Sequence, residues 1–139
     1  MPAVCLYFQA HQPNRLLPYD FFRIGEHQHY EDDGLNARIL AKVCEKCYLP
    51  ANRMFLRAIE ESDGEFRMAL SISGVLIEQL ETWRPDVLET YRELVATGCV
   101  ELLAETYYHS LAFVHSRREF ERQVGMQMEK LDEVFGVVP

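Results

Sequence analysis

Strand-like and helix-like segments alternate three times along this chain, and this alternation constrains its fold more than any other feature. Residues 3–10, 66–73 and 99–105 are short apolar runs bounded by turn residues, which predict buried strands. Each run is followed by a stretch in which apolar residues recur every three or four positions, which predicts a helix. Strand–helix units in series are typical of an α/β fold with a parallel sheet.

Prolines divide the first two helical stretches. The first stretch begins near residue 36, is interrupted at Pro50 and continues to about Glu61. The second resumes at Pro85 and ends at Gly98, a residue typical of helix C-termini. The apolar stripe expected on the first helix consists of Ile39, Leu40, Val43 and Cys47.

The last helix has the clearest boundaries. Ser116 and Glu119 form a capping box at its start, and Gly136 marks its end. Its apolar residues recur at steps of three and four, which predicts a face packed on the core. These residues are Phe120, Val124, Met128, Leu131 and Phe135, with Gln127 beside them.

The length of the chain leaves two architectures open. A closed barrel of eight strand–helix units takes roughly 250 residues, whereas this chain has 139. The chain therefore holds about three units of such a barrel, or else it forms a small open α/β sheet.

The charge balance bears on the partners of the chain. It carries 22 acidic and 14 basic residues, a net charge of −8, so we expect no nucleic-acid partner. A neutral ligand fits this balance, as does an acidic surface that serves only solubility. No run approaches the ~20 apolar residues of a membrane span. The N-terminus lacks the basic region of a secretory signal, so a cytoplasmic protein is expected.

Two of the four cysteines, Cys44 and Cys47, form a C-x-x-C pair. Such a pair is half of a zinc site or a redox pair, but no second pair stands at a zinc-site spacing. We interpret these residues as reduced structural cysteines.

A long loop, residues 13–35, separates the first predicted strand from its helix, where two to six residues are usual. Loops in this position lie at the carboxyl end of the strands, where α/β enzymes place their sites. The alternative is an insertion that only packs on itself. Its aromatic and titratable residues are Tyr19, Phe21, Phe22, His27, His29, Tyr30, Glu31, Asp32 and Asp33.

Polar side chains gather where the predicted strands end. A mixture of hydrogen-bonding groups and aromatic faces suits a sugar, whose hydroxyls bond while its apolar ring face stacks. The first strand supplies Gln9, His11 and Gln12, the second Ser71 and Ser73, and the third Glu101, Glu105, Tyr107, Tyr108 and His109.

Two pairs among these residues suggest chemistry. Glu101 and Glu105 lie four apart, so in a strand both project to one side, as in acid/base or glycoside cleavage. Each is equally explained as a structural hydrogen-bond acceptor. His11 and His109 would need a third converging ligand to hold a divalent metal. Because His11 is followed by Gln12 and a proline, we expect direct hydrogen bonding to a ligand, with no metal and no cofactor.

Several motifs, in order along the chain, resemble those of glycoside hydrolase family 57. The chain has a His-Gln-Pro at the end of residues 8–13 (FQAHQP) and a glycine before a Glu-bearing strand at residues 98–103 (GCVELL). Residues 105–111 (ETYYHSL), 21–25 (FFRIG) and 47–52 (CYLPAN) resemble the α-amylase-type branch of that family. The resemblance covers nearly the whole chain.

The resemblance implies an incomplete (β/α)7 barrel that acts on α-glucan or maltooligosaccharide by retaining hydrolysis or transfer, without a metal. It also implies that residues 1–139 are the N-terminal part of the catalytic barrel. The family carries its nucleophilic Glu in a Trp-x-x-Glu motif on the next strand and its acid/base Asp further on. Neither is present, because the one tryptophan, Trp83, is followed by Arg-Pro-Asp.

By motif position, the resemblance makes His11 and Glu101 substrate contacts, with Gln12, Glu105 and His109 beside them, and assigns no catalytic residue within the chain. A rival hypothesis is a non-catalytic carbohydrate-binding or regulatory remnant. A second rival is a small α/β domain of unrelated function whose motifs are coincidental. If barrel units are missing, the edge of the third strand and the inner helix faces are exposed, which predicts self-association or low stability.

Overall fold

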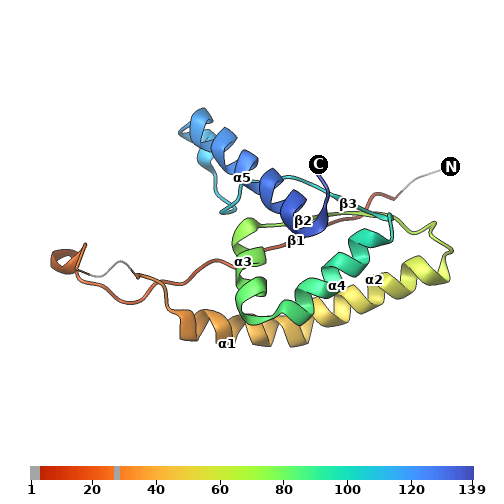
Figure 1. Ribbon diagram of the computed structural model, residues 1–139, viewed down its shortest axis with the longest axis horizontal. Helices are drawn as coiled ribbons and strands as arrows, with labels where there is room; N and C mark the ends of the chain where they lie inside the picture. Colours follow the sequence, from red (N-terminus) through yellow and green to blue (C-terminus); the bar gives the residue numbers. More distant parts are fainter. Residues whose placement is uncertain (1–3, 27–28) are drawn as a thin grey trace.

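The chain alternates strands and helices around one parallel sheet, as Figure 1 shows. The computed structural model describes residues 4–26 and 29–139. The three strands lie side by side in the order β1-β2-β3, and both pairs are parallel. The sheet is open, so the prediction of an α/β fold with three parallel strands is confirmed. The strands and α-helices are β1 (Tyr7–Ala10), α1 (Asp33–Val43), α2 (Leu49–Glu61), β2 (Met68–Ile72), α3 (Gly74–Trp83), α4 (Pro85–Ala96), β3 (Val100–Leu102) and α5 (Arg117–Phe135).

The strands are shorter than the apolar runs predicted. In particular, β3 ends at Leu102, whereas the prediction carried it to Glu105. One more ladder bond follows, from Leu103 N to the carbonyl of Leu70 at 2.9 Å. The chain then turns, because the Thr106 hydroxyl bonds both the carbonyl and the amide of Ser110. A backbone committed to this turn cannot continue the ladder.

A π-helical turn, Cys44–Tyr48, joins α1 to α2, where the sequence predicted an interruption at Pro50. The amide of Leu49 bonds the carbonyl of Cys44, five residues back, and Pro50, which has no amide hydrogen, stands in the first turn of α2. The helical backbone from α1 to α2 is therefore continuous through one wider, π-helical turn, rather than interrupted at Pro50. The predicted stripe through Cys47 is wrong, since Cys47 is exposed. The residues buried along this helix are Asn36, Leu40, Cys44 and Tyr48.

The boundaries of α5 agree with the sequence, but its buried face does not. Ser116 accepts a hydrogen bond from the amide of Glu119, and Gly136 ends the helix with φ 67°. Of the apolar residues predicted to pack on the core, Leu131 is buried, and the others are only partly buried. The buried face of α5 is centred on Gln127 instead, because its side-chain amide donates to the carbonyl of Ile72 over 2.6 Å. The buried residues of the helix are Gln123, Gln127, Leu131 and Val134.

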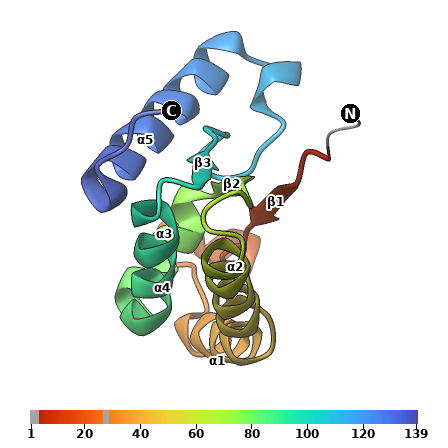
Figure 2. The ribbon, with the colours of Figure 1, turned by 90° about the vertical axis from the view of Figure 1, so that its right-hand side faces the viewer.

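The helices cover one face of the sheet. In Figure 2, α1 to α4 gather below the strands, and α5 lies on the β3 side, where it contacts α3 and α4. The core unites alternate strand residues such as Leu70, Ile72 and Leu102 with buried side chains of the helices. The opposite face carries exposed Tyr7, Gln9 and Glu101. This face of the sheet is left open.

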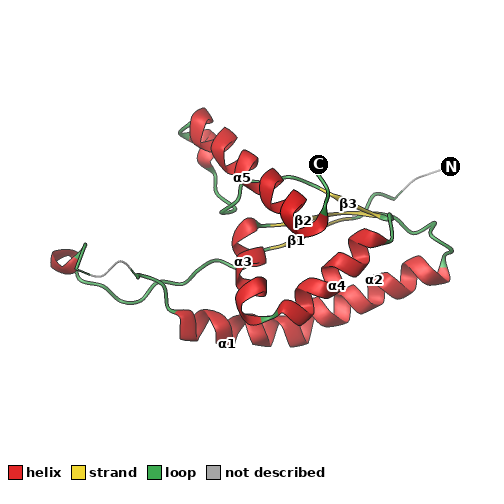
Figure 3. Cartoon of the chain, in the orientation of Figure 1, coloured by secondary structure: helices red, strands yellow, loops and turns green. Residues whose placement is uncertain are grey.

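Residues 13–26 and 29–32 form an arm that projects from the body (Figure 1) and is drawn in Figure 3 as loop with one helical turn. The turn is the 3-10 helix Phe21–Arg23, and a second one, Ala112–Val114, precedes α5. Backbone bonds of 2.8 Å from Leu17 to Tyr30 and from Asp32 to Arg15 join the two legs of the arm. Among the described residues, no helix is both long enough and apolar enough to cross a membrane.

Candidate functional site

Five polar side chains meet at the carboxyl edge of the sheet, and we call them the strand-end cluster: Gln9, His11, Ser73, Glu105 and His109. The first two come from β1 and the residue after it, Ser73 follows β2, and the last two follow β3. They converge because parallel strands in register deliver their ends to the same edge of a sheet.

Glu105 is the centre of the first half of the cluster. Its Oε2 accepts a hydrogen bond from Gln9 Nε2 over 2.9 Å and lies 2.9 Å from His109 Nδ1. Gln9 Nε2 and His109 Nδ1 are themselves 3.0 Å apart. The backbone of His109 has φ 53°, which aims its ring back toward the strand ends. The three side chains are in mutual contact, and His109 Nδ1 either donates to Glu105 or accepts from Gln9, because it carries a proton or a lone pair but not both.

The second carboxylate oxygen of Glu105, Oε1, is buried without a hydrogen-bond partner among the described residues. The Glu105 side chain is only 11% exposed, whereas His109 beside it is 42% exposed. A buried, unpaired carboxylate oxygen is costly unless a donor reaches it. Because Oε1 is shielded from solvent, Oε2 is the oxygen through which Glu105 makes its contacts.

His11 forms the other half of the cluster. Its Nδ1 lies 2.7 Å from the hydroxyl of Ser73, and its ring stands 4.4 Å from that of His109 at an angle of 34°. The hydroxyl of Tyr48 donates to the His11 carbonyl over 3.4 Å. Burial, and next the neighbouring His109, hold the pKa of His11 below its ordinary value, against an opposite effect of Glu105. A lowered pKa favours the neutral imidazole at neutral pH.

Gln12 and Glu101, also predicted for the site, lie elsewhere. The Gln12 side-chain oxygen accepts from Arg15 Nη2 over 3.2 Å rather than from the cluster. Glu101 is paired with Ala69, near the start of β2, and lines a hollow at the amino ends of the strands. The predicted pairing of Glu101 with Glu105 is therefore wrong, because β3 ends between them.

Two tyrosines follow Glu105 in the chain. Tyr107 is buried, and its hydroxyl donates to Glu78 on α3 over 2.6 Å. Burial, and next the bond to Glu78, raise the pKa of Tyr107. Tyr108 is 47% exposed. Tyr107 thus anchors the segment that carries Glu105 and His109, and the ring of Tyr108 packs edge-on against that of Tyr107, with ring centroids 5.0 Å apart.

The C-x-x-C pair is not bonded: both cysteines are free thiols, with Cys44 buried and Cys47 exposed. Burial raises the pKa of Cys44 to about 11, which is opposite to the shift of a redox-active cysteine. Within residues 4–26 and 29–139, no three His, Cys, Asp or Glu side chains are grouped to hold a metal ion.

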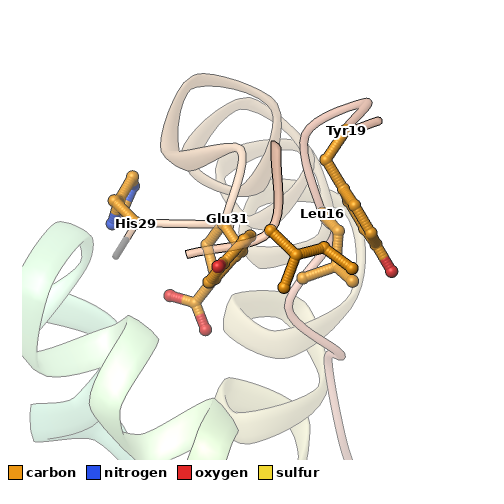
Figure 4. A pocket seen from close by; sticks show the side chains of 6 residues that line it. Leu16, Tyr19, His29 and Glu31 are labelled. Carbon is orange, nitrogen blue, oxygen red and sulfur yellow. The ribbon is translucent and has the colours of Figure 1, made fainter. Parts of the chain in front are cut away.

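The arm has a hollow of its own, of about 630 Å³ (Figure 4). It is lined by Leu16, Tyr19, Ile24, His29, Tyr30 and Glu31. Asn14 connects it to the body, since Asn14 donates to Glu31 and accepts from Gln79, which also donates to the Gln12 carbonyl. His27, which the sequence placed in this loop, lies outside the described residues.

Sequence reasoning placed Gln9 and Ser73 at strand ends but did not assign them to the site. It did not predict the hydrogen bond from the Tyr48 hydroxyl to the His11 carbonyl. The signal for the first two was the two-residue alternation that puts them on the same face as His11. Nothing in the sequence indicated the contact of Tyr48, because the π-helical turn sets where that side chain points.

The sequence model that describes glycosyl hydrolase family 57 matches residues 5–139 of this chain. The chain belongs to glycosyl hydrolase family 57. This membership excludes the rival in which the family motifs were coincidental, and it confirms the resemblance inferred from the sequence.

The proteins similar to this family 57 chain include ones named as alpha-amylases. A Methanocaldococcus jannaschii protein, named as a candidate alpha-amylase, is 39% identical over 93% of this chain and 28% of that protein. An alpha-amylase of Pyrococcus horikoshii is 34% identical over 68% of this chain and 14% of that protein. The family 57 chain therefore spans less than a third of the length of the curated relatives it matches.

A solved structure shares the fold of this family 57 chain. The 4-alpha-glucanotransferase of Thermococcus litoralis matches with a TM-score of 0.66, over 94% of this chain and 17% of that chain. The sequence identity is 18%, so the likeness concerns the fold alone.

Proposed function

We propose that the strand-end cluster is one wall of an α-glucan-binding site in a retaining α-amylase-type hydrolase or transferase. The observation that carries the proposal is the convergence of His11, which follows β1, with Glu105 and His109, which follow β3, at the carboxyl edge of the parallel sheet. The family and the names of its relatives support the substrate class. The motif positions of Gln12 and Glu101 also predict substrate contact, but within the described residues neither side chain is hydrogen-bonded to the cluster, and Glu101 lies at the amino ends of the strands.

The cluster is suited to binding rather than to bond cleavage. Retaining cleavage needs two carboxyl groups about 5–5.5 Å apart, and the cluster holds one, Glu105. Its oxygens accept hydrogen bonds from sugar hydroxyls, and the His11 and His109 rings stand beside them. We propose that residues 1–139 form the N-terminal part of the catalytic barrel, and that the nucleophile and the acid/base residue belong to later strands.

Isothermal titration of this chain with maltoheptaose tests the binding. We expect His11→Ala to weaken the affinity about tenfold, the effect of losing about 1.4 kcal/mol of hydrogen bonding. The matched control is His115→Ala, because His115 is an exposed histidine outside the cluster. Circular dichroism establishes that both variants are folded. Unchanged affinity in folded His11→Ala would remove the basis of the proposal.

The release of reducing sugar from maltoheptaose, measured in parallel, tests whether this chain binds the glucan without cleaving it. We expect binding without turnover by this chain. Turnover that disappears in Glu101→Gln or Glu105→Gln would show that the catalytic carboxylates lie within residues 1–139, against the proposal.

A non-catalytic carbohydrate-binding or regulatory protein is the second candidate, favoured by the single carboxylate in the cluster. The coding sequence separates the two candidates. A strand with Trp-x-x-Glu encoded after residue 139 supports the enzyme, and its absence from the gene supports the binding protein.

A further inference from the structure

The contact between Ser73 and His11 determines which ring nitrogen of His11 carries its proton. A neutral imidazole has one N–H donor and one acceptor nitrogen, and the hydrogen bond made by one nitrogen sets the role of the other. His11 Nδ1 lies 2.7 Å from Ser73 Oγ, whereas Nε2 has no hydrogen bond to any other described residue. The role of Nε2 toward a ligand therefore depends on the direction of the Ser73 bond.

Ser73 is fully buried and already has an acceptor role. It is the N-cap of α3, where its Oγ accepts a hydrogen bond from the amide of Leu76 over 3.4 Å. Its hydroxyl hydrogen then needs an acceptor, and His11 Nδ1 is the one within reach. If Nδ1 carried the proton instead, the buried hydroxyl hydrogen would lack a partner, which folding penalises.

The position of Ser73 is well supported. Its amide donates to the carbonyl of Ala10 over 3.1 Å, which ties it to the end of β1. The carbonyl of Ile72, just before it, accepts from Gln127 over 2.6 Å. These two hydrogen bonds hold the backbone at Ala10, beside His11, and at Ile72, beside Ser73. They therefore keep the Ser73 hydroxyl close to the His11 ring.

We propose that Ser73 is a positioning residue that holds His11 in the tautomer with its proton on Nε2, so that His11 is a hydrogen-bond donor to the ligand. The part concerning the ligand rests on the proposed function. An N–H donor in the same cluster as the acceptor carboxylate of Glu105 suits a pair of neighbouring hydroxyls, one accepting and one donating. The same tautomer excludes metal ligation through Nε2.

Nitrogen-15 NMR of histidine-labelled protein at pH 8 reads the tautomer without any ligand. The His11 signals are assigned from their loss in His11→Gln. We expect a protonated Nε2 and an unprotonated Nδ1 in the wild type, and the same pattern in Ser73→Thr, which keeps the hydroxyl. In Ser73→Asp the side chain still caps the helix but offers only acceptors, so the proton should move to Nδ1. Ser73→Ala should give a mixture of both tautomers.

Two outcomes overturn the proposal. One is a protonated Nδ1 in the wild type, and the other is a pattern that Ser73→Ala and Ser73→Asp leave unchanged. Maltoheptaose titration then tests the donor role: affinity should fall about tenfold in Ser73→Asp and stay near wild type in Ser73→Thr. An Nδ1-protonated Ser73→Asp that binds as well as wild type would contradict the donor role. Absence of binding by wild type, with the tautomer as expected, would count against the proposed function alone.

Discussion

At the scale of single residues, His11 shows how the cluster controls its own charge. Burial and His109 lower its pKa, so the folded protein binds a proton at His11 less readily than the unfolded chain does. Above the ordinary value of about 6.5 neither state is protonated and stability is unaffected. As the pH falls through 6.5 toward the lowered pKa, the unfolded chain takes up the proton first and stability is lost. Urea unfolding between pH 8 and 5 should show this loss, and it should be smaller in His11→Gln.

The neighbours of His11 should shift its pKa in opposite directions. Glu105 raises that pKa, so Glu105→Gln should lower it further. His109 lowers it, so His109→Gln should raise it toward the ordinary value. An NMR titration of the His11 ring proton in both variants measures the two shifts. Shifts of the same sign would show that the arrangement of the three side chains differs from the one described.

The cysteines should differ sharply in reactivity. The thiol of Cys44 is buried with a pKa of about 11, so at pH 8 only ~0.1% of it is thiolate. Cys47 is exposed. We expect a thiol reagent to modify Cys47 at least about a hundredfold faster than Cys44, as measured by mass spectrometry of tryptic peptides. Equal rates would mean that the π-helical turn does not bury Cys44.

At the scale of elements, the start of α3 is packed tightly against the segment that carries Glu105 and His109. A Cβ added at Gly74 would overlap the ring of Tyr107, which is held by its bond to Glu78. Gly74→Ala should therefore lower the free energy of unfolding by about 1–3 kcal/mol. It should also weaken maltoheptaose binding, because Tyr107 positions Glu105 and His109.

Gly125 in α5 provides the matched control. A Cβ added there meets nothing within 4 Å, and its backbone is helical. Gly125→Ala should raise the free energy of unfolding by about 0.5–1 kcal/mol through helix propensity. Urea denaturation of both variants checks the pair. Equal effects in the two would show that Gly74 is not closely packed.

At the scale of the whole molecule, the open face of the sheet determines how the chain behaves in solution. Tyr7 on that face is 53% exposed, and within the described residues β1 and β3 each pair along one edge only. Exposed strand edges and apolar surface favour association. Sedimentation velocity should therefore find self-association of this chain, or urea denaturation should find low stability.

A charge on the open face tests this expectation. Tyr7→Lys should reduce self-association, whereas Met54→Lys should not, because Met54 is similarly exposed, at 51%, but lies on α2. A highly stable, monodisperse monomer would contradict the idea that further barrel units pack on this face.

The sequence by itself determined the order and type of the elements, because apolar periodicity and capping residues such as Ser116 and Gly136 act over a few neighbouring positions. It also determined that His11, Glu105 and His109 would meet, since parallel strands deliver their ends to one edge. The end of β3 at Leu102 and the glutamine-lined face of α5 were decided only by the tertiary structure, through bonds such as that from Gln127 to Ile72. The same holds for the contact of Ser73 with His11: alternation places both side chains on one face, but only the register of β1 with β2 brings these residues, 62 positions apart, together.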